Sequence, residues 1–264
     1  MSQPFLLTEK IKLKNCDPGF CDQREKEKTR ERTLKLCQRI GELQERLYAN
    51  AKSSILLLFQ GMDASGKDGV TKRVLEFVNP AGVETSNFKT PSAEERAHDF
   101  LWRIHKAVPR SGNIGVFNRS HYEDVLIVRV LRLQPEKVWR KRFDQINAFE
   151  RILTHNGVIL LKFFLHISQD EQAERFRARL QDPSRNWKFS ADDLKMRALW
   201  GDFQDAYEDA LNQCSTDHAP WHLVPANRNW YRDYVVAKTV AEALEGLNLT
   251  WPVPLTDLSK IKIV

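Results

Sequence analysis

Apolar residues occur along this chain in short continuous runs and in longer amphipathic stretches. The run at 54–59 is too short to span a membrane and suits a strand buried on both faces. The segment 158–166 is the most strand-like run after it, and the segments 83–89, 113–117 and 219–225 predict three more strands. This order predicts an α/β fold in which helices flank a parallel five-stranded sheet.

Helical spacing, with apolar positions three and four residues apart, fills most of the intervals between these runs. Helices are expected over residues 24–50, 70–78, 93–106, 135–155, 168–180, 190–212 and 229–247. Residues 1–23 hold prolines and no sustained period, which predicts an arm lying on the surface. We therefore expect an N-terminal arm and helix over 1–50, packed on a main domain over 51–264.

Residues 61–69 (Gly-Met-Asp-Ala-Ser-Gly-Lys-Asp-Gly), named here the glycine loop, follow the first strand directly and precede a helix. Gly61, Gly66 and Lys67 fit the phosphate-loop pattern, in which glycines let backbone N–H groups turn onto an anion. The residues expected to hold phosphate are Gly61, Ala64, Ser65, Gly66, Lys67, Asp68, Gly69, Lys72 and Arg73. The structural alternative is a glycine turn that only joins a strand to a helix.

The glycine loop departs from the usual pattern in its charges. Asp68 stands where a magnesium-binding hydroxyl is expected, and Asp63 adds a second carboxylate inside the loop. Extra negative charges suit a loop that meets its phosphates through metal ions, since carboxylate and phosphate oxygens are the usual ligands of Mg²⁺. The loop therefore predicts a metal-assisted phosphate site.

A second polar motif, Asn-Arg-Ser-His-Tyr-Glu-Asp, follows the strand predicted at 113–117. In phosphate-loop enzymes, acidic residues after such a strand bind magnesium beside the loop, and here Glu123 and Asp124 are the candidates. Arg119 could hold a phosphate through its planar guanidinium. A polar loop that only caps a helix is the alternative. Asp63, Glu123 and Asp124 are the predicted metal ligands.

A cluster of cations follows the strand at 158–166. Arg175 and Arg179 share one face of the next helix, and Lys188 lies beyond a break in it. Such a segment, expected over 168–190, is typical of a lid that closes over phosphates and excludes water. An ordinary exposed helix with long basic side chains is the alternative.

Composition narrows the class of partner. The formal net charge of +6 favours an anionic partner such as nucleic acid, an acidic membrane surface or a phosphate-rich substrate. The sequence contains no apolar run long enough for a membrane span and no signal-peptide core at its start. The four cysteines show no metal-ligand spacing and are too few for a disulfide scaffold, which predicts a cytoplasmic protein.

Four motifs together, at 61–69, 117–125, 182–189 and 219–227, resemble the polyphosphate kinase 2 family, and the resemblance covers about residues 30 to 250. The form of the second motif is similar to the branch called class III, although other branches carry aspartate at the position of Asn118. This resemblance implies a phosphate-loop kinase core like that of thymidylate kinase, with a helical lid. It also implies an enzyme that uses inorganic polyphosphate and Mg²⁺, with Mn²⁺ as an alternative, to phosphorylate AMP and ADP to ATP.

By the same resemblance, the catalytic residues are Asp63, Lys67, Arg119, Glu123 and Asp124. The nucleotide and lid residues are expected to be Asn118, Arg119, Arg175, Arg179 and Lys188, of which Arg119, Arg179 and Lys188 match the family's motifs. A homo-oligomer, either a dimer or a tetramer, is also implied.

Two other functions compete with this interpretation. One is a nucleoside or nucleotide kinase that uses ATP as donor, which the phosphate loop alone does not distinguish. The other is a basic protein that binds nucleic acid, but the sequence shows no recognition helix or aromatic-basic RNA motif. We therefore expect no nucleic-acid partner and no membrane.

Overall fold

A computed structural model describes residues 5–254, 256–258 and 261 of the chain. Its centre is a parallel sheet of five strands in the order β2-β3-β1-β4-β5. The strands are β1 (Ser54–Gln60), β2 (Val83–Asn87), β3 (Ile114–Asn118), β4 (Val158–His166) and β5 (Trp221–Pro225). The predicted parallel α/β fold is therefore confirmed.

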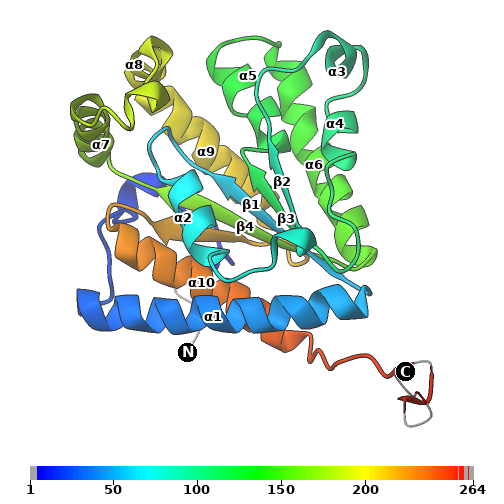
Figure 1. Cartoon of the computed structure of the whole chain (residues 1–264). Helices are drawn as coiled ribbons and strands as arrows, with labels where there is room; N and C mark the ends of the chain where they lie inside the picture. Colours follow the sequence, from blue (N-terminus) through cyan, green and yellow to red (C-terminus); the bar gives the residue numbers. More distant parts are fainter. Residues whose placement is uncertain (1–4, 255, 259–260, 262–264) are drawn as a thin grey trace.

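Helices cover both faces of the sheet, as a parallel sheet requires (Figure 1). On one face lie α1 (Lys26–Asn50), α2 (Lys67–Val74) and α10 (Asn229–Gly246), with α1 packed along α10. On the other lie α5 (Ile127–Val130), α6 (Glu136–His155) and α9 (Trp200–Cys214). In the described part of the chain, no helix is long and apolar enough to cross a membrane.

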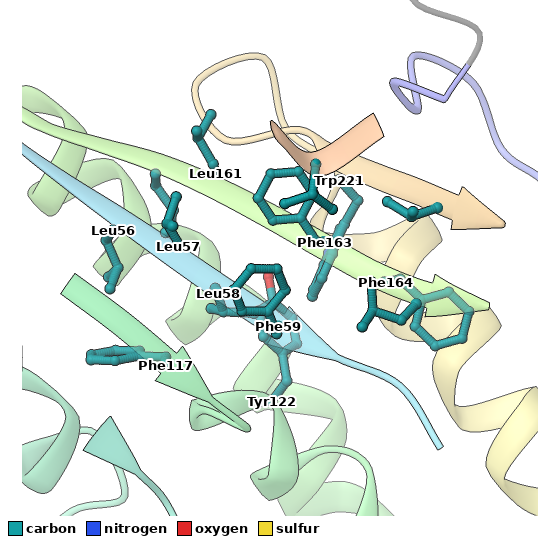
Figure 2. Close-up of a cluster of buried hydrophobic side chains, with 14 of the residues drawn as sticks. Leu56, Leu57, Leu58, Phe59, Phe117, Tyr122, Leu161, Phe163, Phe164 and Trp221 are labelled. Atoms are coloured by element: carbon teal, nitrogen blue, oxygen red, sulfur yellow. The ribbon is translucent and has the colours of Figure 1, made fainter. Parts of the chain in front are cut away.

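The two predicted central strands form the middle of the core. Every residue of β1 is buried, and β4 is buried throughout except for Ile159. Aromatic side chains from neighbouring strands pack against each other, with the rings of Phe59 and Phe163 stacked 5.3 Å apart (Figure 2). The two central strands are thus buried on both faces, whereas the edge strand β2 is partly exposed.

Two predicted helices differ in the structure. The stretch 93–106 contains two short helices, α3 (Ala93–Ala97) and α4 (Trp102–His105), instead of one. The stretch 190–212 divides at Leu199 into α8 (Ala191–Ala198) and α9. The capping box of Ser190 and Asp193 begins α8, and the backbone turns at Leu199 so that α9 can run back over the sheet.

The N-terminal arm does more than lie on the surface. Its backbone pairs with the outer strand β5, because Leu7 N donates to Trp221 O at 2.8 Å and Leu223 N donates to Phe5 O at 2.8 Å. Leu7 and Leu13 are buried. The arm thus covers an edge strand whose N–H and C=O groups would otherwise be unpaired.

The carboxyl ends of the central strands meet at one edge of the sheet. Around this edge rise α3, α4 and α5 on one side and the helices α7 (Gln169–Gln181) and α8 on the other (Figure 1). In open α/β sheets, ligands bind outside the carboxyl ends of the strands. The glycine loop follows β1, and the second polar motif follows the adjacent strand β3, so both reach this edge.

Candidate active site

The glycine loop is shaped by its glycines and by a buried arginine. Gly66 has φ 98° and is the residue before α2, so the loop enters the helix through a left-handed turn. A Cβ on Gly66 would lie 1.9 Å from Nη1 of Arg232, which comes from α10. The position therefore requires glycine for both its conformation and its close packing.

Lys67, the first residue of α2, folds back over the loop. Its Nζ donates to Gly61 O at 2.7 Å and to Met62 O at 3.3 Å. Burial lowers the pKa of Lys67 to about 8, although the charge of Asp63 opposes that shift. The loop thus carries a cation at the N-terminus of a helix, where an anion is favoured.

Arg119 of the second motif contacts the glycine loop. Its Nη2 donates to Asp63 Oδ1 at 2.8 Å. Its backbone N donates to Phe59 O at 3.1 Å, which extends the pairing of β3 with β1 by one residue. Arg119 has φ 64°, which is uncommon for a residue other than glycine and indicates a turn held by its surroundings.

The acidic residues of the second motif occupy two different environments. Burial raises the pKa of Glu123, while the charges of Arg119 and Lys67 oppose the shift. Glu123 therefore lies near Asp63, Lys67 and Arg119, and these four charged residues are called the loop cluster below. Asp124 instead accepts from Arg142 Nη1 at 2.9 Å. Among the described residues, no group of three His, Cys, Asp or Glu side chains is arranged to hold a metal ion.

The lid predicted over 168–190 contains α7 and the short 3-10 helix Asn186–Lys188, and it contacts the glycine loop. Lys188 Nζ donates to Asp68 Oδ2 at 3.1 Å, and Asn118 Nδ2 donates to Asp68 Oδ1 at 2.6 Å. Burial alone would raise the pKa of Asp68, but the two hydrogen bonds outweigh this effect and the pKa is lowered. The lid, the loop and the second motif therefore meet at one carboxylate.

Arg179 approaches the same cluster from α7. Its Nη1 lies 3.9 Å from Oδ2 of Asp193, at the start of α8. Burial raises the pKa of Asp193, the charge of Asp63 adds to the shift, and Arg179 and Arg119 oppose it. Arg179 therefore lies among the charges that surround the loop.

Arg175, which was predicted to contact the nucleotide or the lid, contacts the backbone of the glycine loop. Its Nη1 donates to the carbonyls of Ala64 and Ser65 at 2.8 and 3.0 Å. Its Nη2 donates to those of Ala226 and Asn227 at 2.5 and 3.2 Å. Its Nε donates to Glu171 Oε1 at 2.7 Å, so all three guanidinium nitrogens have partners in the protein and Arg175 contacts the loop from its carbonyl side.

Lys72 and Arg73 lie on the exposed side of α2, past the loop. Arg73 Nη1 forms an ion pair with Glu76 at 2.6 Å. The structure shows no contact that ties either side chain to the loop cluster in its described residues. Their part in holding a phosphate chain stays a prediction.

Several residues around the loop were not found from sequence. Gln172 Nε2 donates to Asp63 O at 2.9 Å, and Tyr207 of α9 is buried next to the charges of Glu123 and Asp63. Arg232, already described, packs on the loop from α10. These residues lie more than 100 positions from the loop along the chain, and no local pattern marks them.

The family model described as Polyphosphate kinase 2 matches residues 23–250. The chain is 47% identical over 256 residues to the AMP/ADP-polyphosphate phosphotransferase of Meiothermus ruber, and covers 96% of each protein. It is 47% identical over 227 residues to the ADP-polyphosphate phosphotransferase of Rhodopseudomonas palustris. That match covers 81% of this chain and 78% of the relative.

A solved structure shares the whole architecture. The crystal structure of Polyphosphate Kinase 2 from Arthrobacter aurescens TC1 matches with a TM-score of 0.94 and 41% sequence identity. The match covers 97% of this chain and 92% of that one.

Proposed function

The chain belongs to the polyphosphate kinase 2 family, and on that premise we propose that it transfers phosphoryl groups reversibly from inorganic polyphosphate to AMP and ADP. The observation that carries the proposal is the meeting of the glycine loop, the second motif and the lid around Asp63 and Asp68. The cationic side chains here suit a phosphate oxyanion, and the carboxylates suit a metal cation bound to that phosphate.

The glycine loop holds the phosphate that is transferred. The loop lies between the carboxyl end of β1 and the N-terminus of α2, a place that favours an anion. Lys67 donates to two loop carbonyls in this structure. A phosphate oxygen is a stronger acceptor than a carbonyl because the bond is charge-assisted, so phosphate draws the ammonium away from these carbonyls.

Arg119 positions the acceptor. Its guanidinium is held beside Asp63 at the mouth of the loop, where it can bind the terminal phosphate of AMP or ADP. The attacking oxygen of that phosphate is already ionised, so the reaction needs positioning and charge neutralisation more than a strong base. The lid residues Arg179 and Lys188 supply further positive charge when the lid closes.

A divalent cation fits the residues present, and we propose Mg²⁺, with Mn²⁺ as an alternative. Asp63 and Glu123 would hold it, because both are carboxylates in the loop cluster. Mg²⁺ is commonly bound through one or two carboxylates and takes its other ligands from water and phosphate oxygens. When bound, it neutralises charge that develops on the phosphates. Asp124, paired with Arg142, is set apart from this pair.

The test is a phosphoryl-transfer assay with Mg²⁺ and long-chain polyphosphate, in which AMP and ADP are offered separately. We expect ADP and then ATP from AMP, since the site must accept acceptors of two lengths. ATP formed only from ADP would restrict the acceptor to the diphosphate. ATP serving as donor to AMP while polyphosphate yields no product would favour the ATP-dependent kinase and overturn the proposal.

Assembly and location complete the proposal. A homo-oligomer, either a dimer or a tetramer, in the cytoplasm is consistent with the resemblance and the cysteine content described above. Light scattering on the purified full chain tests the assembly, and a mass equal to one chain would contradict it.

A further inference from the structure

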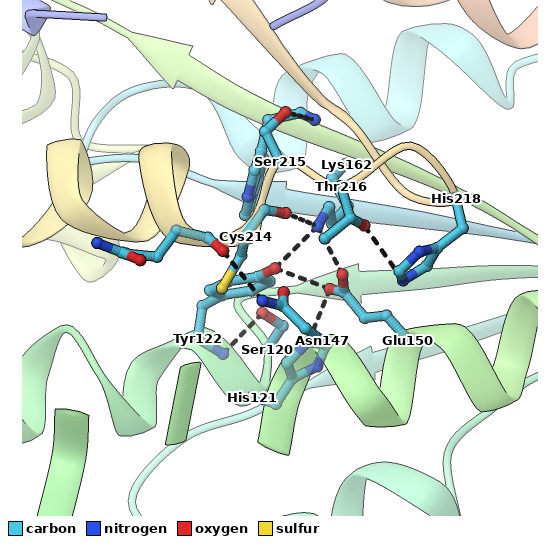
Figure 3. Close-up of polar contacts among 12 residues, drawn as sticks. Ser120, His121, Tyr122, Asn147, Glu150, Lys162, Cys214, Ser215, Thr216 and His218 are labelled. Carbon is cyan, nitrogen blue, oxygen red and sulfur yellow. Dashed lines mark hydrogen bonds and ion pairs between the residues drawn. The ribbon is translucent and has the colours of Figure 1, made fainter. Parts of the chain in front are cut away.

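Lys162 is a fully buried lysine in the middle of β4. Its Nζ donates to Glu150 Oε2 at 2.6 Å, to Tyr122 OH at 2.9 Å and to Cys214 O at 2.6 Å (Figure 3). An ammonium has three donors, so each donor of Lys162 has an acceptor. The side chain therefore joins α6, α9 and the second motif at one point.

The carboxylate of Glu150 accepts hydrogen bonds from Tyr122 as well as from Lys162. Its Oε1 accepts from Tyr122 OH at 2.8 Å and lies 3.2 Å from Nε2 of His121. Burial opposes ionisation, but Lys162 and His121 lower the pKa of Glu150. Glu150 is thus a buried carboxylate that contacts two consecutive residues of the second motif.

Tyr122 and His121 lie inside the turn that presents the site residues. Both are fully buried, while Arg119 and Glu123, on either side of them, belong to the loop cluster. Burial raises the pKa of Tyr122 well above its usual value, so its hydroxyl keeps the proton that it donates to Glu150. His121 and Tyr122, which lie between Arg119 and Glu123, therefore anchor the turn to the protein interior.

Stability alone does not explain a buried ion pair at this place. Taking two charges out of water costs several kcal/mol per ion, and apolar replacements of similar volume are often neutral or stabilising. The backbone of Arg119 meanwhile has a left-handed conformation that its surroundings must impose. A network of fixed hydrogen bonds below the turn supplies that constraint.

We propose that Glu150 and Tyr122 are positioning residues, which hold the turn 119–123 so that Arg119 and Glu123 face the glycine loop, while Lys162 neutralises the buried carboxylate of Glu150. This inference rests on the proposed phosphoryl transfer. The three residues touch no substrate themselves. They act through the turn, because a displacement of about 1 Å at a reacting group can reduce the rate of reaction about 100-fold.

The first test compares two double variants in which neither leaves an unpaired buried charge. Glu150→Gln with Lys162→Met keeps an acceptor for Tyr122 OH, whereas Glu150→Leu with Lys162→Met removes it. We expect both variants to be folded at the assay temperature, with a somewhat lower thermal unfolding midpoint in the leucine variant because the buried Tyr122 hydroxyl loses its acceptor. We expect kcat from polyphosphate to ADP to fall about 10- to 100-fold only in the leucine variant, with KM for ADP changed less than about threefold.

The second test uses Tyr122→Phe, which removes one hydroxyl and leaves Glu150 and Lys162 paired. This variant should remain folded, so it applies even if the double variants unfold. We expect kcat to fall about 10-fold while KM for ADP is retained. Activity within about twofold of the unaltered protein in Tyr122→Phe would overturn the proposal. Absence of transfer in the unaltered protein would instead overturn the proposed function.

Discussion

Arg119 and Asp63 face each other across the carboxyl edge of the sheet, with Nη2 of the arginine 2.8 Å from Oδ1 of the aspartate. They come from motifs 56 residues apart, and the pairing of β1 with β3 brings them together. In the proposed function, Asp63 would bind a metal cation and Arg119 a phosphate. In this structure the two side chains neutralise each other.

Asp63→Ala and Lys67→Ala should each remove most activity without unfolding the protein. We expect kcat/KM to fall about 1,000-fold, because each change removes a charge placed for the transfer. Arg30→Ala, on the exposed N-terminal half of α1, is the control and should keep full activity. Steady-state kinetics with polyphosphate and ADP measure the effect, and circular dichroism checks the fold. Near-normal turnover in either loop variant would remove that residue from the mechanism.

The pH dependence should follow Lys67. Burial lowers its pKa to about 8, and a lysine is charged below its pKa, so the free enzyme loses this cation as pH rises through about 8. We therefore expect kcat/KM to fall above about pH 8. Bound phosphate stabilises the ammonium, so the corresponding fall in kcat should occur at higher pH.

Lys67→Arg provides the control for this profile. A guanidinium stays charged throughout the same range, so the residual activity of this variant should lack the fall near pH 8. Profiles of kcat/KM from about pH 6.5 to 9.5 at saturating divalent cation and constant ionic strength make the comparison. The same fall in both proteins would assign it to another group.

Much of the fold and part of the site could be predicted from sequence, for different physical reasons. β1 is apolar on both faces and appears as a continuous run, and β4 is apolar on both sides of the buried Lys162. The glycine loop was recognisable because its function requires a conformation that few residues adopt. Lys188 was also predicted for the site, and it does contact the loop.

The remaining features depend on contacts that local patterns do not contain. Arg175 and Arg179 share a helix face, yet one binds loop carbonyls and the other lies near Asp193. Asp124 follows Glu123 directly, but successive residues of a short helical turn point in different directions, so only Glu123 joins the loop cluster. Such assignments need the packing of α6, α7 and α10 around the loop.

Asn118→Asp should change the requirement for divalent cation. Asn118 donates to Asp68 at 2.6 Å, and aspartate there would place two carboxylates in contact. Like charges this close favour a bound cation, so we expect the half-saturating concentration of Mg²⁺ to fall several-fold. Titrations of Mg²⁺ at fixed polyphosphate and ADP measure it.

Asn118→Ala separates the charge from the lost hydrogen bond. It removes the donor to Asp68 but adds no carboxylate, so its half-saturating concentration of Mg²⁺ should stay near that of the unaltered protein. If both variants shift this concentration equally, the lost hydrogen bond explains the effect and the added charge does not.

Arg175→Ala should weaken the fold more than the chemistry. Its guanidinium donates to four backbone carbonyls, two in the glycine loop and two after β5, which would lose these donors. Leaving such groups unpaired costs about 1–3 kcal/mol each, and water that enters the site offsets part of this. We expect the free energy of unfolding to fall by about 3 kcal/mol, measured by denaturant titration.

Arg177→Ala is the matched control on the same helix. Arg177 is exposed and pairs with Glu174, so its removal should change the free energy of unfolding very little. Retained stability in Arg175→Ala, together with a raised KM for polyphosphate or nucleotide, would show that Arg175 binds phosphate as the sequence predicted. Lost stability, with an unchanged KM in the fraction that stays folded, would establish that Arg175 supports the fold of the loop. Its hydrogen bonds to the carbonyls of Ala64 and Ser65 would then fix the loop backbone that binds phosphate.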